Sequence, residues 1–92
     1  MQRREVHYSG HVQGVGFRFT TQAIARGYDV TGFVQNLTDG RVRVVAEGQA
    51  AELDGFFAAL EERMAHYIHS KTCDTRAATG QYADFSVAPT GP

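Results

Sequence analysis

The segment GHVQGVGFR, residues 10–18, joins a stretch typical of a β-strand to a stretch typical of an α-helix. Residues 4–12, which overlap its beginning, alternate between apolar and polar side chains. From Phe17, near its end, to Tyr28, the apolar positions recur at helical spacing. The three glycines of the segment allow backbone N–H groups to converge, and the first N–H groups of a helix have no partner within the helix. The segment therefore predicts a loop that binds an anion.

Arg18 stands in the first turn of the predicted helix, where the helix dipole disfavours positive charge. An arginine in this position is explained if an anion lies between its guanidinium and the loop. A guanidinium also presents a planar fork of donors that suits two phosphate oxygens. We therefore interpret the loop as a phosphate-binding site formed by the N–H groups of Gly14, Val15, Gly16, Phe17 and Arg18.

The composition is that of an ordinary globular domain. The chain has 92 residues, of which 42% are hydrophobic and 21% are charged, and we expect a single domain over residues 1–92. A net charge of −1 argues against a broad surface for nucleic acid or acidic lipid. Cys73 is the only cysteine, so no intrachain disulfide forms, and no apolar run is long enough to span a membrane. We expect a cytoplasmic protein with no nucleic-acid partner and no membrane partner.

The first helix is followed by two predicted strands. The helix should end near Asp29, a residue that tolerates a left-handed cap. The strands are Val30–Leu37 and Arg41–Glu47, and they are joined at Thr38-Asp39-Gly40, where Asp-Gly is a strong hairpin signal.

The second helix has the clearest amphipathic pattern of the chain. It opens within residues 48–51, and its apolar stripe consists of Leu53, Phe56, Phe57, Leu60 and Met64. The segment 67–79 shows only a weak pattern and is predicted to be a polar strand at the edge of the sheet. Residues 81–87 predict a short closing strand.

This order of elements, β-α-β-β-α-β with a possible short fifth strand, predicts a ferredoxin-like α+β fold. In that fold, two helices cover one face of an antiparallel sheet. A strand-helix-strand crossover is right-handed, so the first two strands run parallel and end at the same edge of the sheet. One end carries the glycine loop and Arg18, and the other carries Asn36. The topology is therefore expected to bring two polar features that are distant in sequence into one site.

Arg18 and Asn36 support a limited chemistry. The Asn36 amide can hold and orient a water molecule, but neither side chain is a general base near neutral pH. A phosphate ester would have to release a poor alkoxide leaving group, whereas a carboxylic–phosphoric anhydride releases a carboxylate that needs little protonation. Phosphoryl transfer then requires mainly positioning and charge stabilisation, and the substrate's own phosphate can accept the proton. We expect hydrolysis of a small-molecule acyl phosphate, with no metal and no cofactor.

The paired motifs of the chain are similar to those of the acylphosphatases. The matching residues are Gly10-x-Val12-Gln13-Gly14-Val15-Gly16-Phe17-Arg18, Gly32-Phe33-Val34-Gln35-Asn36-x-x-Asp39-Gly40-x-Val42, Glu47-Gly48 and Gly80-x-x-x-Asp84-Phe85. The resemblance covers nearly the whole chain, and residues 66–79 are the least similar part. It implies a ferredoxin-like enzyme that hydrolyses acyl phosphates to a carboxylate and phosphate without a cofactor. It also implies that Arg18 and the loop N–H groups bind the phosphate and that Asn36 orients the attacking water.

Two positions depart mildly from the pattern of that family. Phe33 stands where a tryptophan is common, and Asp29 stands where a glycine often ends the first helix. A metal site is a weaker alternative, because His66 and His69, with Cys73 and Asp74 nearby, match no strong zinc spacing. Cys73 also has no paired base that would make it a nucleophile.

Two further functions are less favoured by the sequence. One is a non-catalytic anion-binding module, like the acylphosphatase-like domain of carbamoyl-transfer proteins, and a chain of this length argues against it. The other is an RNA-binding ferredoxin-like domain, which would need aromatic residues within basic strand motifs. The strand with Arg41 and Arg43 has none. The sequence carries no clear signal for oligomerisation, and we expect a monomer.

Overall fold

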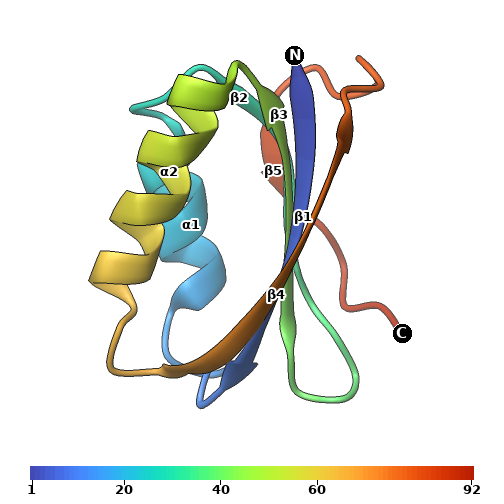
Figure 1. Cartoon of the computed structure of the whole chain (residues 1–92). Coiled ribbons are helices and arrows are strands. Elements are labelled where there is room, and N and C mark those ends of the chain that lie inside the picture. The colour runs from blue at the N-terminus through green and yellow to red at the C-terminus, as the bar shows by residue number, and fades with distance from the viewer.

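The structure, a computed structural model, describes residues 1–92 and consists of one sheet with two helices packed on one of its faces (Figure 1). In chain order, the elements are β1 (Gln2–Gly10), α1 (Phe17–Ala25), β2 (Val30–Asn36), β3 (Val42–Gly48), α2 (Ala50–Arg63), β4 (Ile68–Ala77) and β5 (Phe85–Val87). The predicted element order, the fifth strand and the ferredoxin-like fold are confirmed. None of the helices has the length and apolarity needed to cross a bilayer.

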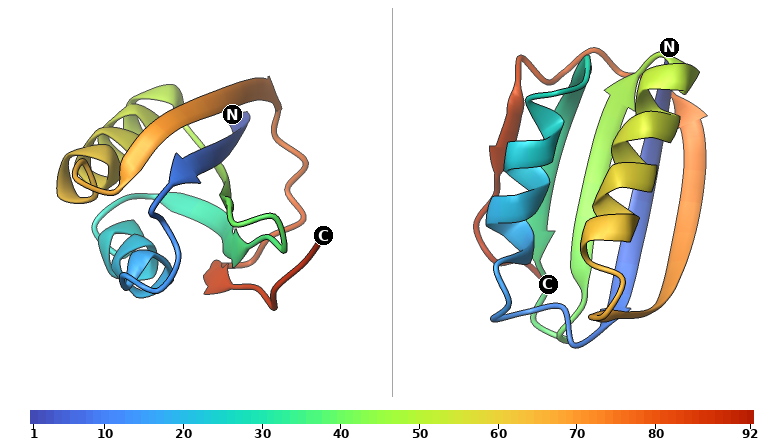
Figure 2. Two further views of the ribbon diagram at one scale, coloured as in Figure 1. Left: turned by 90° about the horizontal axis from the view of Figure 1, so that it is seen from below. Right: turned by 90° about the vertical axis from the view of Figure 1, so that its left-hand side faces the viewer.

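The strand order across the sheet is β4-β1-β3-β2-β5. β1 and β2 both pair antiparallel with β3, which lies between them, so they run parallel to each other as the crossover rule predicted. β5 pairs in parallel with β2, so the sheet is mixed rather than entirely antiparallel. The reason is that β4 runs antiparallel to β1 and β2, so the chain leaves β4 at the end of the sheet where β2 begins. It then crosses to the opposite edge, and β5 runs from there in the direction of β2. Seen from the helix side, α1 lies over β2 and β5, and α2 lies over the other half of the sheet (Figure 2).

The core lies between the helices and the sheet. The apolar helix-facing side chains of β1 and β3, among them Val6, Tyr8 and Val44, are almost completely buried. Every residue of the predicted apolar stripe of α2 is buried, which confirms that the stripe is core packing: Leu53, Phe56, Phe57, Leu60 and Met64. The apolar residues at alternating strand positions and those at helical spacing thus pack together in one layer.

Helix α1 ends earlier than the sequence predicted. It spans Phe17–Ala25, whereas the predicted helix covered residues 17–28. Gly27, whose conformational freedom disfavours a helix, lies in the turn that begins at the cap residue Arg26. The predicted left-handed cap at Asp29 is wrong, because no residue other than glycine has a positive φ. The Asp29 N–H instead donates to Oε1 of Glu52 at 2.7 Å, which attaches the turn between α1 and β2 to α2.

The strand bounds agree with the predicted ones to within a few residues. β1 covers 2–10 rather than 4–12, and β3 covers 42–48 rather than 41–47. The segment 67–79 does contain an edge strand, β4, which pairs only with β1 and leaves nearly all its side chains exposed. Polar alternation extends beyond the paired residues, so only the pairing register shows where each strand ends.

Glu47 is a buried carboxylate that fastens the segment before β5 to the sheet. It is 4% exposed, and its oxygens accept hydrogen bonds from the Thr79 N–H at 2.9 Å, the Thr79 hydroxyl at 2.8 Å and the Gly80 N–H at 2.9 Å. Burial by itself raises the pKa of the Glu47 carboxyl. The hydrogen bonds from Thr79 and Gly80 and the nearby charge of Arg3 outweigh burial, so the pKa lies below its ordinary value.

We expect Glu47→Gln to lower the free energy of unfolding by about 1–3 kcal/mol at neutral pH, because it weakens hydrogen bonds made by a buried charged group. A lowered pKa stabilises the fold at pH values above the ordinary glutamate pKa, about 4.3, and this contribution is lost as the pH falls through the folded-state pKa. Urea unfolding at neutral pH and at about pH 3 measures the effect. The difference between wild type and variant should shrink in acid. A difference that is the same at both pH values, or that is matched by the exposed control Glu62→Gln, would contradict this role.

Candidate active site

The loop between β1 and α1 is held at both ends by buried side chains. Val12 is fully buried and Phe17 is 2% exposed, with its ring centroid 5.4 Å from that of Tyr8. Between these anchors, Gly14 and Gly16 are exposed and have φ angles of 77° and 78°. This left-handed conformation is strained for most residues that carry a Cβ, so both positions favour glycine.

The loop presents backbone donors that the fold leaves unpaired. The N–H groups of residues 14–18 donate to no backbone carbonyl. Gly16 caps α1 without a side-chain hydrogen bond, and the first turn of the helix contains no acidic residue. The amino end of a helix carries a partial positive charge. The loop and the start of α1 therefore suit an anion.

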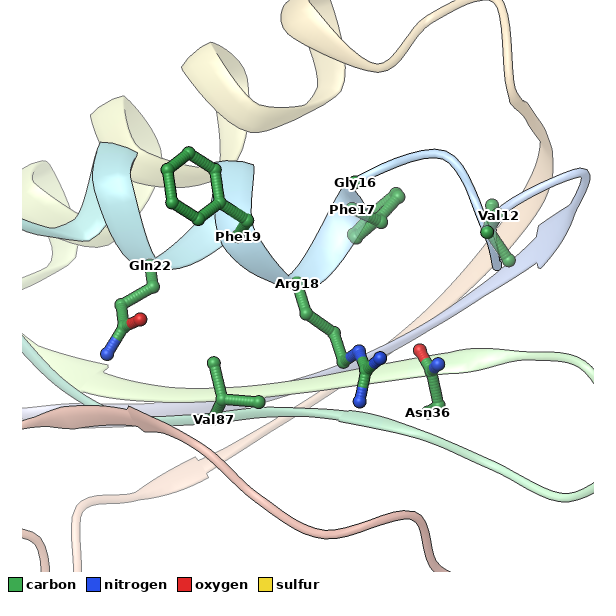
Figure 3. A pocket seen from close by; sticks show the side chains of 9 residues that line it. Val12, Gly16, Phe17, Arg18, Phe19, Gln22, Asn36 and Val87 are labelled. Atoms are coloured by element: carbon green, nitrogen blue, oxygen red, sulfur yellow. The ribbon is translucent and has the colours of Figure 1, made fainter.

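Arg18 is an exposed arginine that takes part in none of the ion pairs of the protein. Other arginines are engaged, since Arg4 lies 2.7 Å from an Asp54 oxygen and Arg43 lies 2.9 Å from a Glu5 oxygen. The side chain of Arg18 extends from α1 toward the end of β2 (Figure 3). Its guanidinium is therefore a free cation beside the loop.

Asn36 is the last residue of β2, at the edge of the sheet where β1 also ends. Its Oδ1 atom is buried and has no hydrogen-bond partner. A buried acceptor without a partner costs free energy comparable to that of a lost hydrogen bond. The atom is consequently available to a donor that enters from the pocket.

The loop, Arg18 and Asn36 meet in a cavity of about 420 Å³ (Figure 3). The lining consists of Val12, Gly14, Gly16, Phe17, Arg18, Phe19, Gln22, Asn36 and Val87. Of the predicted site residues, only Val15 is absent from this lining, because its side chain packs against the core. The lining contains neither a carboxylate nor a histidine, so it offers no general base of the usual kind.

Gln13 is a residue of the site whose role the sequence did not reveal. Its Nε2 donates to the carbonyl of Leu37 at 2.8 Å and to the carbonyl of Arg41 at 3.0 Å. Leu37 directly follows Asn36, so the Gln13 amide ties the loop to the strand end that carries Asn36. Its place within the loop segment was visible in the sequence, but its acceptors are backbone carbonyls that only the folded chain brings near.

We expect Gln13→Ala to raise the inhibition constant of inorganic phosphate about three- to tenfold. The variant loses the two hydrogen bonds of the Gln13 amide, each worth about 1 kcal/mol. Without them, the loop can move relative to Asn36. Inhibition of turnover by phosphate measures the change. Gln49→Ala is the matched control, because Gln49 is an exposed glutamine whose side chain makes no capping hydrogen bond. An unchanged inhibition constant in Gln13→Ala would rule out the tether.

The C-terminal segment fastens Asn36 from the other side. The Gly91 N–H donates to the Asn36 carbonyl at 3.0 Å, and Nε2 of Gln35 donates to the Pro89 carbonyl at 2.9 Å. A Cβ on Gly91 would collide with the Gln35 amide, so a larger residue would disturb this contact. This arrangement could not be predicted from the sequence, because it depends on backbone groups.

The histidines and the cysteine do not form a second site. No three His, Cys, Asp or Glu side chains gather in the way that a metal ion needs, and His66 and His69 belong to no such group. Cys73 is exposed on β4. Independence from a metal stays a prediction, to be tested with a chelator.

The basic residues of β3 and of the turn before it are already paired. Arg41 Nε lies 2.8 Å from Asp39 Oδ2, and Arg43 Nε lies 2.9 Å from Glu5 Oε2. The ring of Phe33, on the neighbouring strand, has its centroid 5.2 Å from the Arg43 guanidinium carbon. An aromatic side chain thus does reach this basic residue, but it comes from β2 and not from the strand of Arg43 itself. The absence of a nucleic-acid partner stays a prediction.

The fold and the cavity together define a class of small ferredoxin-like proteins in which a glycine loop, an arginine and an amide line one pocket. The sequence model of the family described as Acylphosphatase matches residues 4–87. The chain belongs to the acylphosphatase family, and it is a hydrolase of that type.

Individual relatives are similar over most of the chain. An acylphosphatase of Leuconostoc mesenteroides is 35% identical over 95% of this chain and 98% of its own length. The crystal structure of an acylphosphatase from Bacillus subtilis is similar with a TM-score of 0.86 and 28% identity, over 96% of this chain and 99% of that one. HypF from T. kodakarensis is similar with a TM-score of 0.81 and 27% identity, over 96% of this chain and 12% of that one. The likenesses to the two acylphosphatases support acyl phosphate hydrolysis as the reaction.

Proposed function

We propose that the cavity binds the phosphate of an acyl phosphate through the unpaired N–H groups of residues 14–18 and the Arg18 guanidinium. The observation that carries the proposal is the meeting of these donors with the unpartnered Asn36 Oδ1 in one pocket. Fixed donors stabilise the charge that develops on phosphoryl oxygens without reorganising during the reaction. Arg18 contributes two hydrogen bonds in one plane as well as its charge.

Asn36 positions the attacking water. A water molecule can donate one hydrogen bond to the buried Oδ1, which leaves a lone pair of the water oxygen free to approach phosphorus. Because Asn36, at the end of β2, and the loop line the same pocket, we expect the water to approach a phosphate held by the loop from the side of β2. Orienting the two reactants in this way removes part of the entropic barrier.

The chemistry of an acyl phosphate suits a pocket without a general base. The water oxygen forms a bond to phosphorus while the bond from phosphorus to the acyl oxygen breaks, and the electron pair leaves with the carboxylate. One proton of the water passes to a phosphoryl oxygen, so an acyl phosphate dianion and water give a carboxylate and dihydrogen phosphate. A carboxylate leaves without protonation, and the step requires neither a metal nor an acid from the protein.

The assay that tests the proposal measures inorganic phosphate released from acetyl phosphate in the presence of EDTA, with a phosphate monoester as the comparison substrate. We expect turnover of acetyl phosphate that the chelator does not change and no comparable turnover of the monoester. Loss of activity in EDTA would indicate a metal-dependent reaction. Phosphate binding without turnover would favour a non-catalytic module.

A further inference from the structure

The half of the cavity away from Asn36 has two apolar side chains in its lining, and the phosphate-binding groups do not use it. Phe19 of α1 and Val87 of β5 line this half, with Gln22 one turn further along the helix. In Figure 3, Phe19, Gln22 and Val87 lie on one side of Arg18 and Asn36 lies on the other. Phe19 and Gln22 are on the helix, and Val87 is on the strand below it. The pocket therefore has one end whose donors suit phosphate and another end where Phe19 and Val87 offer apolar surface beside the Gln22 amide.

Packing does not explain why these two side chains are apolar. Phe19 is 77% exposed and Val87 is 40% exposed, and the only other large hydrophobic residues exposed to a similar degree are Met1 and Tyr67. The core-facing positions of α1 are Phe17, Thr21 and Ala25, so Phe19 points away from the core. Two of the few exposed apolar side chains thus line the same pocket, and such clustering is typical of a ligand site.

We propose that Phe19 and Val87 form the acyl subsite and that the protein prefers acyl phosphates with an apolar, above all an aromatic, acyl group. The inference rests on the proposed function, because the acyl carbon is separated from phosphorus by one bridging oxygen. When the phosphate occupies the loop, the acyl group must lie beside it. A flat ring can pack against the exposed face of Phe19 and against the Val87 methyl groups. The methyl group of acetyl phosphate offers much less apolar area to these two side chains than a ring does.

The subsite should influence substrate binding more than the chemical step. Contacts with the acyl group are the same before and during cleavage of the bond to phosphorus, so they lower the KM without raising kcat. One apolar contact in a pocket typically changes selectivity about tenfold, and less when the wall is partly open to water.

The experiment compares benzoyl phosphate with acetyl phosphate in wild type, Phe19→Ala and Phe19→Leu. We expect Phe19→Ala to lower the ratio of kcat/KM for benzoyl over acetyl phosphate about five- to tenfold, through a higher KM for benzoyl phosphate. Phe19→Leu should restore part of the ratio, because leucine keeps an apolar wall. Tyr67→Ala, which removes an exposed aromatic ring outside the pocket, should leave the ratio unchanged. Alanine favours a helix, so Phe19→Ala should keep the fold.

Binding of two non-hydrolysable phosphonates, with benzoyl-methyl and acetyl-methyl groups on phosphorus, separates this inference from the proposed function. Tighter calorimetric binding of the aromatic compound that depends on Phe19 supports the subsite even if neither acyl phosphate is hydrolysed, and that result would refute only the proposed reaction. Turnover of both acyl phosphates with a ratio that Phe19→Ala leaves unchanged would overturn the subsite and leave the proposed function in place. An equal loss of the ratio in Tyr67→Ala would also overturn it.

Discussion

Replacing Arg18 by alanine is expected to lower kcat/KM for acetyl phosphate by at least about 10³-fold. The guanidinium is the one charged group in the lining of the pocket and is engaged in no ion pair. Its loss removes both the charge and the planar pair of donors that hold the phosphoryl oxygens as negative charge redistributes. Steady-state release of phosphate measures turnover, and inhibition by inorganic phosphate measures phosphate binding. Both turnover and phosphate binding should be lost together.

Arg26→Ala is the matched control for this substitution. Arg26 caps the other end of the same helix, is exposed and does not line the pocket. We expect its removal to leave turnover near the wild-type value. Arg18→Lys should recover only part of the activity, because an ammonium keeps the charge but not the planar fork. Wild-type turnover in Arg18→Ala would refute the proposed phosphate site.

Replacing Asn36 by alanine is expected to lower kcat about 10²-fold or more while the inhibition constant of phosphate changes by less than about twofold. The amide acts on water in this proposal, and the phosphate is held by the loop and Arg18. The substitution therefore affects the chemical step more than binding. Single-turnover kinetics together with phosphate inhibition separate the two quantities.

The stability of Asn36→Ala distinguishes a functional amide from a structural one. Because Oδ1 of Asn36 has no partner in the fold, the alanine variant loses no intramolecular hydrogen bond at that atom, and its unfolding temperature should not fall. Thr38→Ala, at an exposed position two residues further along, is the control for local disturbance of the turn. A fall in stability with full activity would mean that Asn36 serves the fold and not the reaction.

Local patterns in the sequence were enough to predict the main elements. Alternation marked β2 and β3, the Asp39-Gly40 pair marked the hairpin between them, and the helical stripe marked α2. The end of α1 was placed too late, although Gly27 is a local signal for it. The contact of Asp29 with Glu52 could not be predicted in the same way, because a hydrogen bond to a partner on another helix leaves no local signal.

The candidate site likewise contains some features that short sequence patterns could predict and others that they could not. Arg18 and the glycines could be recognised because helix dipoles and left-handed φ angles are properties of short segments, and a handedness rule was enough to place Asn36 beside them. The Gln13 tether, the C-terminal contacts and the apolar wall of Phe19 and Val87 could not be inferred, since each joins residues that are distant in the chain.

The sequence by itself therefore determined the order of the elements, the strand-helix loop and the pairing of a cation with an amide at one sheet edge. Only the tertiary structure decided that the Asn36 oxygen is buried without a partner, that β5 runs parallel at the edge, and that Phe19 faces a pocket rather than solvent alone. The physical reason is one of range. Periodicity, turn preference and helix polarity act over a few residues, whereas burial, hydrogen-bond satisfaction and cavity shape depend on what other segments bring to the same place.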